Sequence, residues 1–168
     1  RVFDGEEKLG TAFSQVINFH KAVGATISIN KELNSSYSGS GAEGLINGIS
    51  GSDTRYGDKE WLGFSGEDLE VTIDLGKAME INSIEMRFHN GNGQWIYAPK
   101  QIQLSIDDND FETFDLPKSD LLVVNKKLNP NKKGSVILLR IPNYGLIPEG
   151  KQGAGHKAWM FIDEIIIN

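Results

Sequence analysis

Short runs of alternating apolar and polar residues, each ended by a turn cluster, most constrain what this 168-residue chain can become. The clearest runs are residues 69–75, which stop at Gly76, and residues 102–106, which end in a cluster of Asp and Asn. Alternation with a period of two places every second side chain on one face of a strand. Helical periodicity is poor, apart from one or two turns around residues 42–49. The pattern predicts an all-β chain of about eight short strands.

Further apolar runs, separated by clusters of Gly, Pro, Asn and Asp, extend this pattern along the chain. They lie at residues 25–29, 81–88, 111–114, 121–124, 135–141 and 159–167. Short strands joined by turns favour an antiparallel β-sandwich. A chain of this length can bury a core without disulfides or metal ions as staples.

Composition and charge exclude several classes of function. The formal net charge is −6, which argues against a nucleic-acid partner because phosphates need a basic face. The absence of Cys excludes thiol catalysis, Cys-based zinc sites and a disulfide scaffold. No run approaches the roughly 20 apolar residues of a membrane-spanning helix. We therefore expect no nucleic-acid partner and no membrane partner.

The first 19 residues read differently from the rest of the chain. Residues 1–3 and 13–19 look like two short strands around a turn at Asp4-Gly5. Two strands alone cannot make a core, so they either join the sandwich as edge strands or end a preceding module. The first five residues also lack the charged-then-apolar build of a signal peptide. We expect a piece of a longer polypeptide whose main domain spans residues 20–168.

Sequence motifs of catalysis are absent. The chain has three histidines, His20, His89 and His156, but no His-Glu-x-x-His zinc motif and no Gly-x-Ser-x-Gly elbow. Its glycines form no phosphate-binding loop followed by Lys and Ser or Thr. A carboxylate pair for glycoside hydrolysis can be chosen in many ways among 23 acidic residues, so it carries no information. We therefore expect no enzyme active site within this chain.

Aromatic residues in loop-like segments suggest a sugar-binding surface. Trp61 lies in residues 56–64, and Trp95 and Tyr97 lie in residues 90–97, which are rich in Asn and Gly. The C–H face of a pyranose stacks on aromatic rings, while amide, carboxylate and guanidinium groups bind its hydroxyls. The alternative is that each ring caps the core. For Trp159, which begins the last apolar run, the core is the preferred interpretation.

Residues 45–52 form an oxygen-rich turn around Asn47 that suggests a hard cation such as Ca²⁺. Glu164 would supply the full negative charge if the last strand passes nearby. Composition alone favours the simpler interpretation, which is a plain Asn-Gly turn.

An ordered series of motifs resembles discoidin-like domains, also called coagulation-factor type C domains or family 32 carbohydrate-binding modules. The matching segments are residues 21–27, 45–52, 61–64, 69–76, 105–111 and 161–165. The variant is similar to the C-terminal module of exported β-N-acetylhexosaminidases (chitobiases) of the Bacteroides type. The resemblance implies a jelly-roll β-sandwich of the galactose-binding-like kind, sugar binding by loops at one end, and no catalysis. It also implies that residues 1–19 are the last strands of a preceding immunoglobulin-like domain.

The resemblance further implies a structural Ca²⁺ near the Asn47 turn. Carried over by position, its ligands are Leu45, Asn47, Ile49, Ser52 and Glu164. The family often has Asp in place of Asn47 and Thr in place of Ser52. Because Asn removes one negative charge, we expect weaker binding of the cation.

Candidate sugar-binding residues combine the aromatic rings with polar loop residues. They are Arg55, Tyr56, Trp61, Asn92, Gln94, Trp95, Tyr97 and His156. Arg55 and His156 are residue types that such sites use. An equally good interpretation is that each is a solvent-exposed loop residue without a binding role.

The leading hypothesis is a monomeric, non-catalytic module of an exported glycoside hydrolase (periplasmic, cell-surface or extracellular). It would bind a terminal hexose or N-acetylhexosamine and contact neighbouring domains of the same polypeptide. A structural spacer that binds nothing is the alternative. A protein- or membrane-binding discoidin domain ranks last, because the loops carry Asn, Asp and Gly rather than apolar tips beside basic residues.

Overall fold

Two antiparallel sheets make up the main body of the protein in the computed structural model, which describes residues 2–4, 7–9 and 14–168. The five-stranded sheet has the order β3–β5–β10–β7–β8, and the four-stranded sheet has the order β4–β11–β6–β9. The strands are β3 (Thr26–Ile29), β4 (Leu62–Ser65), β5 (Leu69–Ile81), β6 (Ile84–His89), β7 (Gln101–Ile106), β8 (Glu112–Asp115), β9 (Val123–Leu128), β10 (Lys132–Ile141) and β11 (Trp159–Ile167). The predicted antiparallel β-sandwich is confirmed, as is the jelly-roll class.

The core lies between the two sheets and follows the alternation seen in the sequence. Leu69, Val71 and Ile73 of β5 are fully buried, while the residues between them are only partly buried. Strand β10 pairs with both β5 and β7, so its inward side chains join the core from the middle of the sheet. Burying these aliphatic side chains contributes about 1.5–3 kcal/mol each, which makes the alternation the main determinant of the fold.

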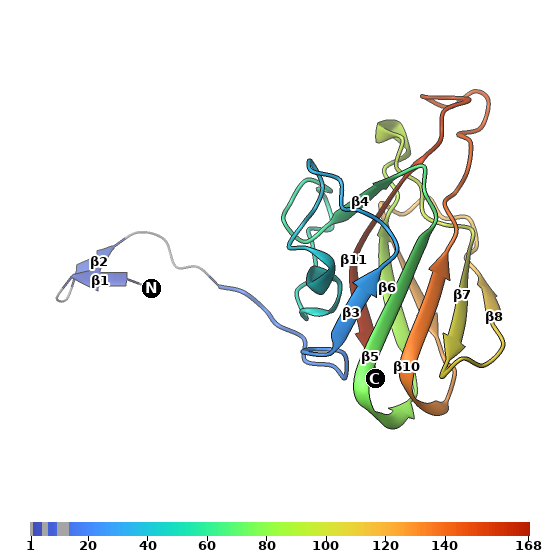
Figure 1. Ribbon diagram of the computed structural model, residues 1–168. Helices are drawn as coiled ribbons and strands as arrows, with labels where there is room; N and C mark the ends of the chain where they lie inside the picture. Colours follow the sequence, from blue (N-terminus) through green and yellow to red (C-terminus); the bar gives the residue numbers. More distant parts are fainter. Residues whose placement is uncertain (1, 5–6, 10–13) are drawn as a thin grey trace.

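Strand β11 occupies the centre of the four-stranded sheet, between β4 and β6 (Figure 1). Its pairing with β6 shifts register between Ile162 and Ile165, and the two residues in between, Asp163 and Glu164, are buried carboxylates. The chain end is held by Lys21, whose backbone N–H donates to the carbonyl of Ile167 at 2.8 Å. Central pairing therefore fixes the last strand in a chain that has no disulfide.

Two short 3-10 helices interrupt the loops, η1 (Ala42–Ile46) and η2 (Asn92–Gln94). Residues 56–61 form the expected loop, and the end of that segment, from Leu62, belongs to β4. No helix in the described part of the chain is long and apolar enough to cross a membrane.

The N-terminal region departs from one of the two expected arrangements. Strands β1 (Val2–Asp4) and β2 (Glu7–Leu9) pair antiparallel with each other and join neither sheet of the sandwich. In the structure these two strands are therefore not edge strands of the sandwich. Residues 14–19 form no strand, while Gly5 and Phe13 of the expected turn and strand lie outside the described residues. The immunoglobulin-like origin of this segment stays a prediction.

Candidate binding site

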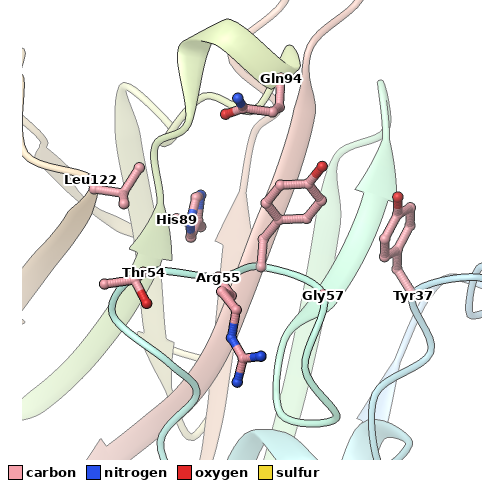
Figure 2. A pocket seen from close by; sticks show the side chains of 8 residues that line it. Tyr37, Thr54, Arg55, Gly57, His89, Gln94 and Leu122 are labelled. Carbon is pink, nitrogen blue, oxygen red and sulfur yellow. The ribbon is translucent and has the colours of Figure 1, made fainter.

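A cavity of about 710 Å³ opens at the end of the four-stranded sheet where β6 finishes and β9 begins. Four loops contribute to it, and Figure 2 shows their side chains arranged around the opening. The lining residues are Tyr37, Thr54, Arg55, Tyr56, Gly57, His89, Gln94 and Leu122. The volume lies in the range of cavities that hold small molecules. We call it the His89 cavity.

His89 is the most unusual residue of this cavity, because it is polar and only 1% exposed. Its Nδ1 accepts a hydrogen bond from the backbone N–H of Gly91 at 3.2 Å. In the neutral imidazole the proton then sits on Nε2, which has no hydrogen-bond partner among the described residues. Burial lowers the pKa of His89 below its usual value, although the charge of Asp58 opposes this. The ring therefore stays neutral near pH 7 and offers one unpaired N–H donor.

Aromatic rings surround His89. The ring of Tyr56 meets His89 edge-on, with centroids 5.4 Å apart, and Trp61 does the same from another side at 5.4 Å. Tyr37 lies 6.1 Å from Tyr56, and both rings pack on Phe161 of β11. The cluster gives the cavity one apolar aromatic wall beside a polar donor.

The loop that carries Thr54, Arg55 and Tyr56 is anchored at its base by a buried charge pair. Arg87 of β6 contacts Asp163 of β11 at 3.2 Å, and the backbone N–H of Gly51 donates to the same carboxylate at 2.7 Å. Burial raises the pKa of Asp163 to about 7, while Arg87 and the Gly51 N–H act in the opposite direction. These contacts fix where the loop leaves the sheet and hence where its side chains stand.

Trp61 supports the same loop from below. It is completely buried, its Nε1–H donates to the carbonyl of Ser52 at 3.0 Å, and a Cβ added to Gly51 would lie 2.5 Å from its ring. A buried ring cannot stack on a sugar, so the assignment of Trp61 to sugar contact is wrong and the core alternative holds. Trp61 nevertheless contributes to the cavity indirectly, because it packs under the loop at Gly51 and Ser52 and so positions that loop.

Three of the predicted sugar-binding residues, Arg55, Tyr56 and Gln94, do line the His89 cavity. Arg55 is exposed, and Figure 2 shows its guanidinium extending away from Gln94. It forms no ion pair within the described residues, so it is free to change rotamer.

Trp95, Tyr97 and Asn92 lie outside this cavity. The Trp95 ring stacks on His156 with centroids 4.9 Å apart and planes 20° apart, and Gly153 packs so closely that an added Cβ would lie 2.5 Å from the ring. Trp95 is therefore half-buried under the 148–157 loop. Tyr97 is buried, and the side chain of Asn92 is hydrogen-bonded to Asn90 and to the carbonyl of Ile96. Neither lines the His89 cavity.

Sequence reasoning missed five residues of the cavity wall. They are Tyr37, Thr54, Gly57, His89 and Leu122. His89 carried a usable signal, since it ends an apolar strand and precedes an Asn-Gly loop. Tyr37 and Leu122 carried none, because only the packing of distant loops brings them to the opening.

Two parts of the predicted cation site, Glu164 and the Asn47 turn, lie together in the structure. Glu164 lies against the Asn47 turn, since the backbone N–H of Gly48 donates to its Oε1 at 3.2 Å. His20 Nε2 contacts the same oxygen at 3.0 Å, while Oε2 is buried without a partner among the described residues. Ser52 is engaged elsewhere, because its hydroxyl contacts Thr54 at 3.2 Å and its carbonyl accepts from Trp61. The described residues include no group of three or more His, Asp or Glu side chains that could hold a metal.

Comparison with known proteins identifies the fold. No protein-family model matches the chain, and no curated protein matches it. Among solved structures, CpGH89CBM32-6 produced by Clostridium perfringens is 16% identical with a TM-score of 0.53, over 89% of this chain and 98% of that one. The fucose binding module SpX-3 of Streptococcus pneumoniae is 11% identical with a TM-score of 0.57, over 89% and 97%.

A third match places the same fold inside a larger chain. A Ruminococcus gnavus GH29 fucosidase in complex with fucose is 12% identical with a TM-score of 0.53, over 89% of this chain but only 26% of that one. The chain therefore has the fold of family 32 carbohydrate-binding modules, which confirms the discoidin-like resemblance at the level of fold.

Proposed function

We propose that this chain is a non-catalytic carbohydrate-binding module that holds a terminal hexose or N-acetylhexosamine in the His89 cavity. The observation that carries the proposal is the buried, unpaired Nε2–H of His89 beside an aromatic wall. An unpaired buried donor costs about 1–3 kcal/mol, so a ligand oxygen that accepts from it recovers that penalty. The carbohydrate-binding modules that share the fold support the same function.

A sugar is held here by stacking and hydrogen bonding together. Its apolar C–H face lies on the ring of Tyr56 or Tyr37, which recovers apolar area without breaking hydrogen bonds to hydroxyls. Because its Nε2 is buried in the unliganded protein, His89 donates to one ring or hydroxyl oxygen once a side chain that covers it shifts. The Gln94 amide both donates and accepts, as vicinal hydroxyls require. Arg55 swings over the opening to donate to another hydroxyl. Leu122, which is exposed at the rim, faces a methyl or acetyl substituent.

Affinity for one monosaccharide is expected to be weak, because few atoms are buried and each hydroxyl must be desolvated. Such a module acts by tethering. It raises the effective concentration of a linked catalytic domain near its glycan. We propose that the parent is an exported glycoside hydrolase of the chitobiase (β-N-acetylhexosaminidase) type; the fucosidase that contains this fold as a fraction of its length supports such an arrangement.

The test is a titration of galactose, N-acetylgalactosamine and N-acetylglucosamine into the wild-type protein and His89→Ala, followed by NMR or calorimetry. The matched control is His156→Ala, since His156 is exposed and stacks only on Trp95. We expect at least one sugar to bind the wild type and His156→Ala alike, and His89→Ala to bind it about tenfold more weakly or worse. If the wild type shows no detectable binding of any of these sugars at high concentration, the proposal is contradicted.

A spacer role is the second candidate function, and one observation favours it. Val16, Ile17 and Phe19 are 71%, 48% and 82% exposed just before the sandwich begins. Apolar side chains in such a row suit a contact with a neighbouring domain of the same polypeptide. A spacer without ligand predicts no response to any sugar, so the same titration separates the two functions.

We also propose a Ca²⁺ ion at the Asn47 turn, supported by the unpartnered Oε2 of the buried Glu164. Glu164 and the Asn47 side chain would hold it, and the ion would neutralise the buried carboxylate. A cation that binds only the folded protein at 100 times its dissociation constant adds about 2.7 kcal/mol to the free energy of unfolding. We expect Ca²⁺ to raise the melting temperature of the wild type and not of Glu164→Gln. If EDTA and Ca²⁺ leave the wild-type melting curve unchanged, the proposal of a bound ion is wrong, and the contacts of this carboxylate are those to His20 and to the Gly48 N–H.

A further inference from the structure

A second cavity, of about 350 Å³, shares no lining residue with the His89 cavity. Its walls come from the residues around Tyr97 before β7, from the 116–120 segment after β8, and from the 144–151 loop. The 90–95 segment contributes to both cavities, since Gln94 lines the first and Asn90 and Asn92 line the second. We call the second one the Tyr97 cavity.

The charge of the Tyr97 cavity is opposite to that of the protein as a whole. Three lysines, Lys100, Lys118 and Lys151, line it against a single aspartate, Asp120, although the chain carries a net charge of −6. None of the three lysines forms an ion pair or side-chain hydrogen bond with an acidic residue in the described part of the chain. Ammonium groups gathered around one opening without acidic partners make it attractive to an anion.

The inner wall holds an unsatisfied polar group. Tyr97 is only 5% exposed, and its hydroxyl is buried with no hydrogen-bond partner among the residues described. Its ring lies 4.7 Å from that of Tyr144 at a tilt of 36°. A buried hydroxyl without a partner costs about 1–3 kcal/mol, which a ligand or a water reaching it would recover.

The remaining wall is apolar and suited to a sugar ring. Tyr144 is half-buried, and Lys100 Nζ lies 4.1 Å from the centre of its ring, so a cation–π contact holds this ammonium group at the rim. Pro99, Pro117 and Pro148 also line the cavity. The volume suits one small ring rather than a peptide or a nucleic acid.

The geometry points to the Tyr97 cavity as a second glycan subsite, separate from the first, that binds a sugar bearing a carboxylate or a sulfate. The anionic group lies between Lys118 and Lys151, the sugar ring packs on the apolar wall of Pro117 and Pro148, and the Tyr97 hydroxyl donates to a ring or hydroxyl oxygen once the side chains above it move aside. This inference does not rest on the neutral sugar proposed for the His89 cavity, because the two sites have no residue in common.

The experiment titrates three sugars that differ only in the group at C6, which is neutral in galactose and anionic in galacturonic acid and galactose 6-sulfate. NMR of the wild-type protein measures the affinity for each one and maps the residues that respond. We expect the two acids to shift resonances of Tyr97, Tyr144 and Lys118, and galactose to leave these unchanged. Stronger binding of galacturonic acid assigns the site to carboxylates, and stronger binding of the sulfate assigns it to sulfated sugars. Acids that produce no shift at these residues overturn the inference.

Variants separate a specific site from general charge attraction. The double variant Lys118→Glu/Lys151→Glu should weaken binding of the preferred acid about tenfold or more, since exposed charge pairs contribute up to about 1 kcal/mol each and reversal adds repulsion. The matched control Lys77→Glu removes an exposed lysine outside both cavities and should change the affinity less than about twofold. Equal losses in both variants would mean nonspecific attraction and would overturn the inference.

Tyr97→Phe tests the hydroxyl. Because Tyr97 Oη has no partner within the described structure, its removal should leave the melting temperature unchanged or raise it. Affinity for the acid should nevertheless fall about threefold to tenfold. Unchanged affinity in both Tyr97→Phe and the double lysine variant overturns the site. If Tyr97→Phe and the double lysine variant lose acid binding but keep galactose binding, and His89→Ala does the reverse, the two cavities bind their ligands independently.

Discussion

The two cavities are built from neighbouring loops, yet they present different chemistry. The His89 cavity has a neutral N–H donor, an amide and tyrosine rings, whereas the Tyr97 cavity has three lysines and a buried phenol. One is anchored to the centre of the sandwich through Arg87, Asp163 and Trp61, and the other is closed by the 144–151 loop. A sandwich can therefore keep one core while neighbouring pairs of loops present different side chains at its end.

The largest effect is expected at Trp61, which supports only the His89 cavity. Trp61→Ala leaves a large void in a fully buried position and removes the hydrogen bond to the Ser52 carbonyl. We expect the free energy of unfolding to fall by about 3–5 kcal/mol, as measured by chemical denaturation. In the fraction that remains folded, neutral-sugar binding should be lost while acid binding persists. If both ligands are lost together from folded protein, the two cavities are one cooperative unit.

His89→Ala gives the next largest effect on binding, and because it also removes a buried, hydrogen-bonded ring, binding is measured on protein shown to be folded. Neutral-sugar affinity should fall about tenfold or more, because the ligand loses its buried donor. Binding of the acid at the Tyr97 cavity should stay within about twofold of wild type, since His89 does not line that cavity. Calorimetry with each sugar on the same sample measures both. An equal loss of affinity for the two sugars would mean that the two cavities do not bind independently.

Gly153→Ala should affect the second cavity instead. Gly153 has φ +82°, and a Cβ there would lie 2.5 Å from the Trp95 ring, so the 148–157 loop must shift. Gly150→Ala is the matched control, with φ +78° and no atom within 4 Å of the added Cβ. We expect Gly153→Ala to cost about 1–3 kcal/mol more than Gly150→Ala in thermal denaturation. In Gly153→Ala, binding of the acid should weaken and binding of the neutral sugar should not. Equal thermal stability of the two variants would mean that the Trp95 contact does not hold the loop.

The smallest effect concerns pH and the buried imidazole. Burial lowers the pKa of His89 in the folded protein below the 6.5 of a free histidine. Between these two values the unfolded chain binds more protons, so stability is lost as the pH falls through that window. Asp163 has the opposite effect on stability. Because its pKa is raised, the folded protein binds this proton at a higher pH than the unfolded chain does, so stability increases as the pH falls.

Comparison with His89→Gln separates the histidine from the aspartate. When the pH is lowered from about 7.5 to about 5.5, the melting temperature of the wild type should fall further than that of this variant. A variant with the same slope as the wild type would mean that His89 titrates normally, and its role as a neutral donor would fail.

The sandwich was predictable from sequence because the alternation of apolar and polar residues is visible within each strand by itself. Leu69, Val71 and Ile73 show the buried face of β5 without reference to any other segment. The discoidin-like motifs added the jelly-roll class. The N-terminal segment was less predictable, since nothing local says whether β1 pairs with β2 or with the sandwich.

The site was only partly predictable, for a physical reason. Arg55, Tyr56 and Gln94 were found because their residue types suit sugars, and the structure brings them to one cavity. Trp61 and Trp95 were chosen by the same reasoning, but one is a core residue and the other packs under a glycine and His156. Exposure of a loop aromatic depends on which loop folds over it, and that information is not local. His89 could not be predicted as a site residue, because no sequence pattern shows that a buried nitrogen lacks a hydrogen-bond partner.

The most direct test of the central claim is an NMR map of the residues that respond to a neutral sugar. Backbone and side-chain resonances are assigned, and N-acetylhexosamine or galactose is titrated to saturation. We predict the largest shifts at His89, Tyr56 and Gln94, with Trp95 and His156 unaffected. Shifts centred on Trp95 and His156, or no shifts at any concentration, would contradict the account.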